Sequence, residues 1–248
     1  LRGAGLSELI DLIGPAGLSA AILAMFFGAA AQASIGMGLN LFTVGILALI
    51  NPVFVPGPIL VHSFLLSIVA SIRLRRDIAV DELAVSVAGL VAGTMLAVIV
   101  LALIPTDSLP RMFGALIVAG VVVTAAGMAI PPKPSTILAA SAAAGVMGTL
   151  AGTHGPPIAL VYQREPPQRI RAALLPFFAA ANPISLVGLA AVGLFGWREI
   201  QASILLLPGL VAGYIAGVML MPYLNARFVR AAILLISAAS GIALMIKG

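Results

Sequence analysis

The sequence predicts an all-α polytopic membrane protein, with two five-segment repeats that together contain eight long and two short membrane segments. The 248 residues are 62% hydrophobic and only 8% charged, whereas a soluble domain carries about 25% charged residues. The apolar residues recur in blocks from about residue 18 to residue 246, too many for a signal peptide or one anchor. These blocks show no alternation of apolar and polar residues, so only helices can satisfy their backbone in hydrocarbon.

Each half contains four long apolar blocks and one short block, if a span is taken as about 20 residues. The first long block of each half ends in a glycine-rich break, and the short block follows that break. A basic turn ends the third block of the first half, and a proline-rich stretch ends the fifth. The blocks of the first half are 18–33, 39–50, 58–74, 83–104 and 109–130. Those of the second half are 136–150, 158–163, 171–195, 202–221 and 228–246.

The two halves repeat residues at a nearly constant offset. Gly28 and Gly145 are separated by 117 positions, and Ser67 and Ser185 by 118. The five residues at 89–93 recur, with the same sequence, at 209–213. Ordered matches whose offset drifts this little favour an internal duplication. We therefore predict an N-terminal membrane repeat at 1–130 and a C-terminal membrane repeat at 136–248.

The distribution of Lys and Arg favours ten membrane crossings. If the two short blocks do not cross, the two sides carry seven and six basic residues, which is no bias; if they cross, the sides carry nine and four. Because basic residues concentrate on the cytoplasmic side, the second count predicts that both termini lie outside. Five crossings per half would make the repeats inverted. Block 158–163 would span only about 9 Å as a helix, so eight crossings stay the alternative.

The two breaks are the predicted transport site. Broken helices at matching positions free backbone groups and direct helix N-termini inward, which favours an anion. The glycines would let an oxyanion approach the main chain; the alternative is that they only permit close helix packing. Gln32, Ser34, Thr153 and His154 are expected to donate hydrogen bonds. The predicted substrate-binding residues are Gln32, Ser34, Gly36, Gly38, Asn40, Ser63, Gly152, Thr153, His154, Gly155 and Asn182.

Several of these polar residues also have a packing interpretation. His154 and His62 are the only side chains in the blocks or breaks that titrate near neutral pH. A direct role and a packing role are equally consistent for His154, and packing is favoured for His62. Ser63, Ser67 and Ser71 lie four residues apart on one helix face. They could line the site or bond back to their own helix.

The composition and the missing motifs exclude several classes of function. The chain has no Cys, which removes thiol nucleophiles, iron-sulfur clusters and cysteine-zinc sites. No Asp or Glu lies within an apolar block, which disfavours an acidic cation exchanger. P-loop, His-Glu-x-x-His and Gly-x-Ser-x-Gly motifs are absent, so we expect no enzyme, no cofactor and no metal. The basic residues are scattered in short loops, so we expect no nucleic-acid partner.

The second break carries the most specific resemblance to a known family. Residues 145–157 resemble the glycine-rich signature of the sulfite exporter TauE/SafE family, also called the four-toluene-sulfonate uptake permease family. The break at 28–38 and the hydroxyl-bearing segment with its basic turn at 63–76 extend the resemblance over nearly the whole chain, although the first break lacks a run of three glycines. The resemblance implies transport of sulfite, sulfoacetate or other sulfonates.

We therefore expect a secondary transporter, with export as the expected direction, of small sulfur-containing or organic oxyanions. A passive anion channel of the same fold is the alternative, and a membrane scaffold without transport is the third hypothesis. The expected partners are a small anionic substrate and the lipid bilayer, and a homodimer is the assembly considered. The expected location is the bacterial inner membrane, with multiple crossings.

Overall fold

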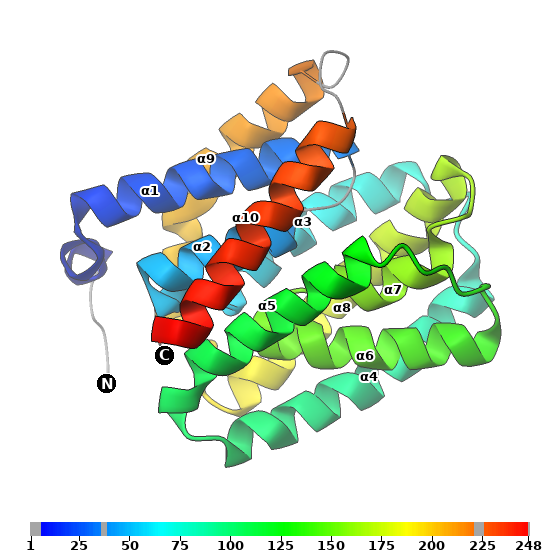
Figure 1. The fold of residues 1–248 in the computed structure, drawn as a ribbon, viewed down its shortest axis with the longest axis horizontal. Helices are drawn as coiled ribbons and strands as arrows, with labels where there is room; N and C mark the ends of the chain where they lie inside the picture. The colour runs from blue at the N-terminus through cyan, green and yellow to red at the C-terminus, as the bar shows by residue number, and fades with distance from the viewer. Residues whose placement is uncertain (1–5, 36–38, 221–225, 248) are drawn as a thin grey trace.

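The computed structural model describes residues 6–35, 39–220 and 226–247, and every regular element in these ranges is a helix (Figure 1). Seven helices in the described residues are long and apolar enough to cross a membrane. The eighth predicted long segment, α5, has 17 residues. The helices are α1 (Leu6–Ile35), α2 (Leu39–Ile50), α3 (Gly57–Arg73), α4 (Val80–Leu103), α5 (Leu109–Ala125), α6 (Pro134–Ala151), α7 (Gly155–Tyr162), α8 (Pro167–Ala191), α9 (Trp197–Leu220) and α10 (Ala226–Lys247), with 3-10 turns at Pro52–Phe54 and Thr106–Ser108.

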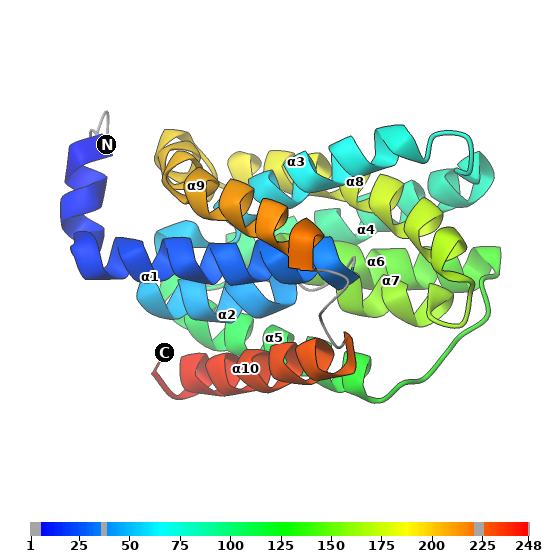
Figure 2. The ribbon, with the colours of Figure 1, turned by 90° about the horizontal axis from the view of Figure 1, so that it is seen from above.

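The helices follow the predicted blocks closely, except at the start of α1 and the end of α5. α1 begins at Leu6 and contains a kink at Gly14, whose φ of 73° is left-handed, followed by Pro15. The piece before the kink bends away from the rest of α1 (Figure 2). α5 ends at Ala125, although apolar residues continue to residue 130. In both places local backbone geometry, and not hydropathy, sets the boundary.

Two pairs of parallel helices approach each other closely at glycines. In the pair α1 and α9, a Cβ added at Gly213 would lie 2.1 Å from the carbonyl oxygen of Phe26. In the pair α4 and α6, a Cβ added at Gly93 would lie 1.9 Å from the carbonyl oxygen of Ala142. The repeated five-residue sequence thus lies at a close helix crossing in each half. For these glycines the packing interpretation is confirmed.

The contacts between helices occur in matching sets in the two halves. α1 packs against α9 as α6 packs against α4, and α1 contacts α2 as α6 contacts α7. α2 contacts α10 as α7 contacts α5, while α3 packs against α8 and α5 against α10. Two inverted five-helix repeats would produce such a pattern. The division into repeats at 1–130 and 136–248 stays a prediction.

Successive helices run in opposite directions between two ends of the molecule (Figure 1). One end, which we call the basic end, is tied together by an ion pair between Arg169 and Glu82 and by a 3.1 Å hydrogen bond from Gln168 to Asp77. The basic residues at this end are Arg73, Arg75, Arg76, Lys133, Arg164, Arg169, Arg171, Arg227 and Arg230. At the opposite end, in the described residues, they are Arg111, Arg198 and Lys247.

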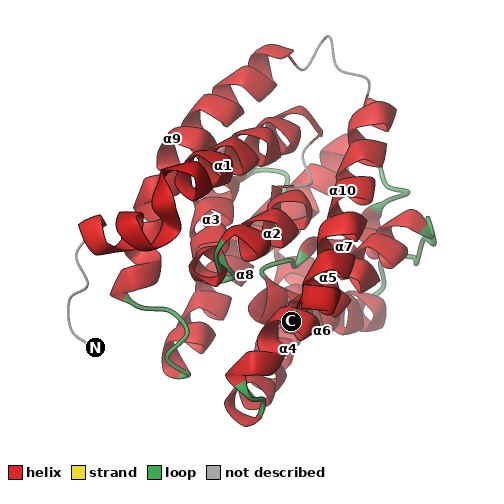
Figure 3. Cartoon of the chain, turned by 60° about the vertical axis from the view of Figure 1, so that its left-hand side comes forward, coloured by secondary structure: helices red, strands yellow, loops and turns green. Residues whose placement is uncertain are grey.

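The short helices α2 and α7 lie inside the bundle. Figure 3 shows α2 enclosed by α1, α3, α9 and α10. Leu47 of α2 packs in a buried cluster with Met25 of α1 and Leu206 of α9. Ile158 of α7 packs in a second cluster with Phe177 of α8. With eight residues, α7 spans about 12 Å as a helix. The two short helices therefore begin in the interior, where the site lies.

Candidate functional site

The two breaks meet in the interior of the molecule. Asn40, in the first turn of α2, donates a hydrogen bond from Nδ2 to the carbonyl oxygen of Gly152 at 2.7 Å. Gly152 ends α6 in the left-handed conformation, with φ 72°, which favours glycine. The chain can therefore turn back into α7 beside the start of α2. Residues 112 positions apart in sequence are joined directly by this contact.

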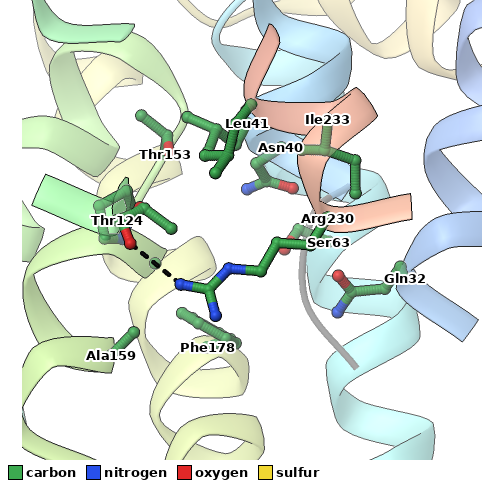
Figure 4. Close-up of a pocket in the computed structure, with 13 residues that line it drawn as sticks. Gln32, Asn40, Leu41, Ser63, Thr124, Thr153, Ala159, Phe178, Arg230 and Ile233 are labelled. Carbon is green, nitrogen blue, oxygen red and sulfur yellow. Dashed lines mark hydrogen bonds between the residues drawn. The ribbon is translucent and has the colours of Figure 1, made fainter. Parts of the chain in front are cut away.

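A cavity of about 120 Å³ lies where the breaks meet (Figure 4). It is bordered by α1, α2, α3, α5, α7, α8 and α10, with one wall formed by the second break. Five of the predicted site residues line it: Gln32, Asn40, Ser63, Thr153 and Gly155. The other lining residues are Leu41, Thr124, Pro156, Ala159, Phe178, Arg230, Ile233 and Leu234. The walls are mostly apolar, with polar groups at a few positions, as is typical of small-molecule sites.

Thr153 is the most strongly buried polar side chain of the cavity. Its exposed fraction is 1%, and its Oγ1 has no hydrogen-bond partner among the described residues. A buried hydroxyl without a partner is unfavourable, so such groups in proteins normally contact water or a ligand. The hydroxyl of Thr153 is thus available to a molecule in the cavity.

The first turns of α2 and α7 both face the cavity, but they offer different numbers of donors. Helix N-termini carry N–H groups without partners inside the helix and a partial positive charge. In α2, the N–H of Leu39 donates to Oε1 of Gln32 at 3.3 Å, and the following N–H groups belong to non-proline residues. In α7, Gly155 is followed by Pro156 and Pro157, which have no N–H. The cavity therefore receives more main-chain donors from α2.

Arg230 is a lining residue that the sequence analysis missed. It lies near the start of α10 and is the one charged side chain among the lining residues; none of them is a carboxylate. Its Nη2 donates to the carbonyl oxygen of Thr124 at 3.0 Å (Figure 4). The sequence analysis used Arg230 only to count charges at segment ends. Its position inside the predicted block 228–246 was the available signal, because charged residues within membrane segments are usually functional.

His154 is buried away from the cavity, although it follows Thr153 directly. Its Nε2 lies 2.9 Å from Oγ of Ser185, which in turn lies 2.8 Å from Oγ1 of Thr149. The ring packs against α6 so closely that a Cβ at Gly148 would lie 2.0 Å from it. His154 does not line the cavity. The expected donation from its side chain to a substrate has no support in this geometry, and the packing interpretation is favoured.

Asn182 and Gly152 are also outside the cavity lining. Asn182 is fully buried and donates from Nδ2 to the carbonyl oxygen of Phe178 at 2.7 Å. Gly152 contributes indirectly, because its carbonyl oxygen binds Asn40. Gly36 and Gly38 lie outside the described residues, as does the side chain of Ser34. The structure therefore brings five of the eleven predicted residues to one cavity.

The remaining polar residues of α3 bond to the backbone. His62 is fully buried, with Nε2 at 3.0 Å from the carbonyl oxygen of Ser203. Ser67 donates to the carbonyl oxygen of Ser63 at 2.6 Å, and Ser71 to that of Ser67 at 2.7 Å. Back-bonding is thus confirmed for Ser67 and Ser71, while Ser63 faces the cavity.

The comparisons with known proteins identify the family. The family model described as sulfite exporter TauE/SafE matches residues 21–244, which contain both breaks and every residue that lines the cavity. No curated protein and no solved structure gives a significant match to the chain. The family match extends over nearly the whole chain, as the glycine-rich second break predicted. The chain belongs to the sulfite exporter TauE/SafE family.

Proposed function

We propose that this protein is a secondary transporter that exports small sulfur-containing oxyanions, such as sulfite and sulfonates, across the bacterial inner membrane. Its family is a transporter family, and its seven long apolar helices make it a multi-pass membrane protein. The observation that carries the proposal is the convergence of the first turns of α2 and α7 on one cavity that contains the buried, unpaired hydroxyl of Thr153.

The chemistry of the cavity suits a small anion. Two helix N-termini give it a partial positive charge without any acidic group nearby. Side-chain donors are available from Gln32, Asn40, Ser63 and Thr153. The apolar walls exclude water, and electrostatic attraction to an anion is stronger in such an environment. No nucleophile paired with a base lines the cavity, so we assign it binding and no catalysis.

The proposed direction rests on the charge distribution. Basic residues concentrate on the cytoplasmic side of membrane proteins, so we assign the basic end to the cytoplasm. Arg230, the exposed residue of the cavity lining, belongs to that end. An anion would therefore enter this conformation from the cytoplasm. Exchange of conformation between two inverted repeats would then open the site to the other side. Assembly as a homodimer is a separate proposal, which the mass of the solubilised protein would test.

Transport by purified protein in vesicles tests the proposed function. Radiolabelled sulfite should enter with saturation and with counterflow, because a carrier exchanges its substrate across the membrane. Linear flux with resolvable single-channel currents would support the passive channel instead. Absence of flux for sulfite and for simple sulfonates, with a protein shown to be folded, would contradict both proposals and favour the scaffold hypothesis.

A further inference from the structure

The positive charge of Arg230 has no acidic partner in the described part of the chain. The ion pair between side chains there joins Arg169 to Glu82, and neither residue lines the cavity. The cavity lining contains no Asp or Glu. A guanidinium beside mostly apolar walls, without a carboxylate, is able to bind an anion that enters the cavity.

The guanidinium is held by a neutral acceptor instead. Its contact, 3.0 Å from Nη2, is the carbonyl oxygen of Thr124 in the last turn of α5. Carbonyls in the last turn of a helix lack intrahelical partners and carry its partial negative charge. The hydroxyl of Thr124 bonds back to the carbonyl oxygen of Gly120 at 2.7 Å, so the main chain alone holds Arg230. One of the five N–H donors of the guanidinium is used in this contact.

Helices α5 and α10 are joined differently at their two ends. Far from the basic end, a Cβ at Gly114 would lie 2.5 Å from the carbonyl oxygen of Gly241, so the backbones nearly touch. At the basic end, the described polar contact between the two helices is the one from Arg230 to Thr124. If Arg230 released Thr124, the helices could separate at the basic end while the glycine contact held them at the other.

We propose that Arg230 captures the transported anion, and that capture loosens α5 from α10 at the basic end. The guanidinium would leave the carbonyl of Thr124 and bind two oxygen atoms of the anion. An oxyanion accepts two parallel charge-assisted hydrogen bonds from a guanidinium, which are stronger than one bond to a neutral carbonyl. The exchange is therefore favoured when the anion arrives. This inference rests on the proposed function, since it assigns a residue to the same site.

Calorimetric titration with sulfite tests the capture role. Arg230→Gln should bind sulfite at least about tenfold more weakly than the wild type, because a charge-assisted pair is lost. Arg230→Lys keeps the charge without the planar fork and should fall between the two. Arg76→Gln is the matched control, because Arg76 is exposed at the same end and does not line the cavity. It should bind within about twofold of the wild type. Melting temperatures without anion show whether each variant is folded.

Spin-label distances test the loosening step. Labels at Val122 and Leu235, which are 60% and 71% exposed, would report the side of α5 and α10 nearer the basic end. Sulfite should lengthen or broaden this distance in the wild type and leave it unchanged in Arg230→Gln. Labels at Arg111 and Ile246, near the opposite end, should show no change.

The possible outcomes separate the inference from the proposed function. If Arg230→Gln and Arg230→Lys bind sulfite as tightly as the wild type, the capture role is wrong and the transport proposal stands. If sulfite binds through Arg230 without any change of distance, the loosening step is wrong. If the wild type binds neither sulfite nor methanesulfonate, the proposed function is overturned together with this inference.

Discussion

The first break brings two polar side chains to the cavity, Gln32 and Asn40, whereas the second brings one hydroxyl, that of Thr153. The second break also turns its histidine, His154, into the protein interior. The two breaks match in position but differ in chemistry. Correspondence between repeats therefore identifies where a site lies, and each residue must still be assigned from its own contacts.

The difference follows from how each break is held. In the second break, a buried chain of hydrogen bonds runs from His154 through Ser185 and Thr149 to Thr94, across α4, α6 and α8. Such networks are strong in a low-dielectric interior and fix the backbone around them. In the first break, the contact across the turn is that of Gln32 with the N–H of Leu39, and both belong to the cavity region. One break supplies a rigid support, and the other supplies most of the polar surface.

The support of the second break can be broken most strongly at Gly148. Gly148→Ala places a Cβ 2.0 Å from the His154 ring, which must move. We expect a loss of about 1–3 kcal/mol of unfolding free energy, the usual effect of overpacking a core. Gly155→Ala is the matched control, because its Cβ would meet Phe178 at 4.0 Å, an ordinary contact. Thermal unfolding in detergent should show a large decrease for the first variant only; equal melting temperatures would mean that the histidine is not tightly packed.

The contribution of the second break to binding can be removed at Thr153. Thr153→Val keeps the shape and deletes the unpaired hydroxyl, so sulfite affinity should fall about tenfold. Stability without anion should be unchanged or higher, since no hydrogen bond in the described residues is lost. Thr43→Val is the control: its hydroxyl bonds to the carbonyl oxygen of Leu39 at 2.6 Å and does not line the cavity. Unchanged affinity in Thr153→Val would remove this residue from the site.

The histidine itself should affect stability more than transport. His154→Gln disturbs the contact with Ser185 and should cost about 1 kcal/mol of unfolding free energy. Because His154 does not line the cavity, the pH dependence of methanesulfonate transport should keep its wild-type shape. Methanesulfonate stays ionised across the range, so its own titration does not interfere. A flattened pH profile in this variant would restore the direct role that the sequence analysis left open.

The helices were largely predictable because apolar runs interrupted by glycine, proline and charge mark membrane segments plainly. α2 begins and ends at the predicted residues, and most other boundaries lie within a few positions. The start of α1 was missed because Glu8 and Asp11 interrupt the apolar run. The end of α5 was missed because residues 126–130 are apolar while Gly127 adopts φ 61° and leaves the helix.

The location of the site was predictable, but the direction of its side chains was not. Glycine-rich breaks indicated where helices would be interrupted, and five predicted residues do line one cavity. Nothing in the sequence states that adjacent residues Thr153 and His154 face different surroundings. Arg230 reaches the cavity from another helix, and only tertiary packing brings it there. Contacts between distant segments are the information that a single sequence does not supply.

The central claim, that the two breaks form one anion site, is tested most directly by locating a bound anion. Selenite is a close analogue of sulfite, and anomalous diffraction from its selenium atom would place it in a crystal of the protein. The account predicts a single strong peak in the cavity, within hydrogen-bonding range of the Thr153 hydroxyl and of the first turn of α2. A peak only at the protein surface, or one that contacts a single break, would contradict it.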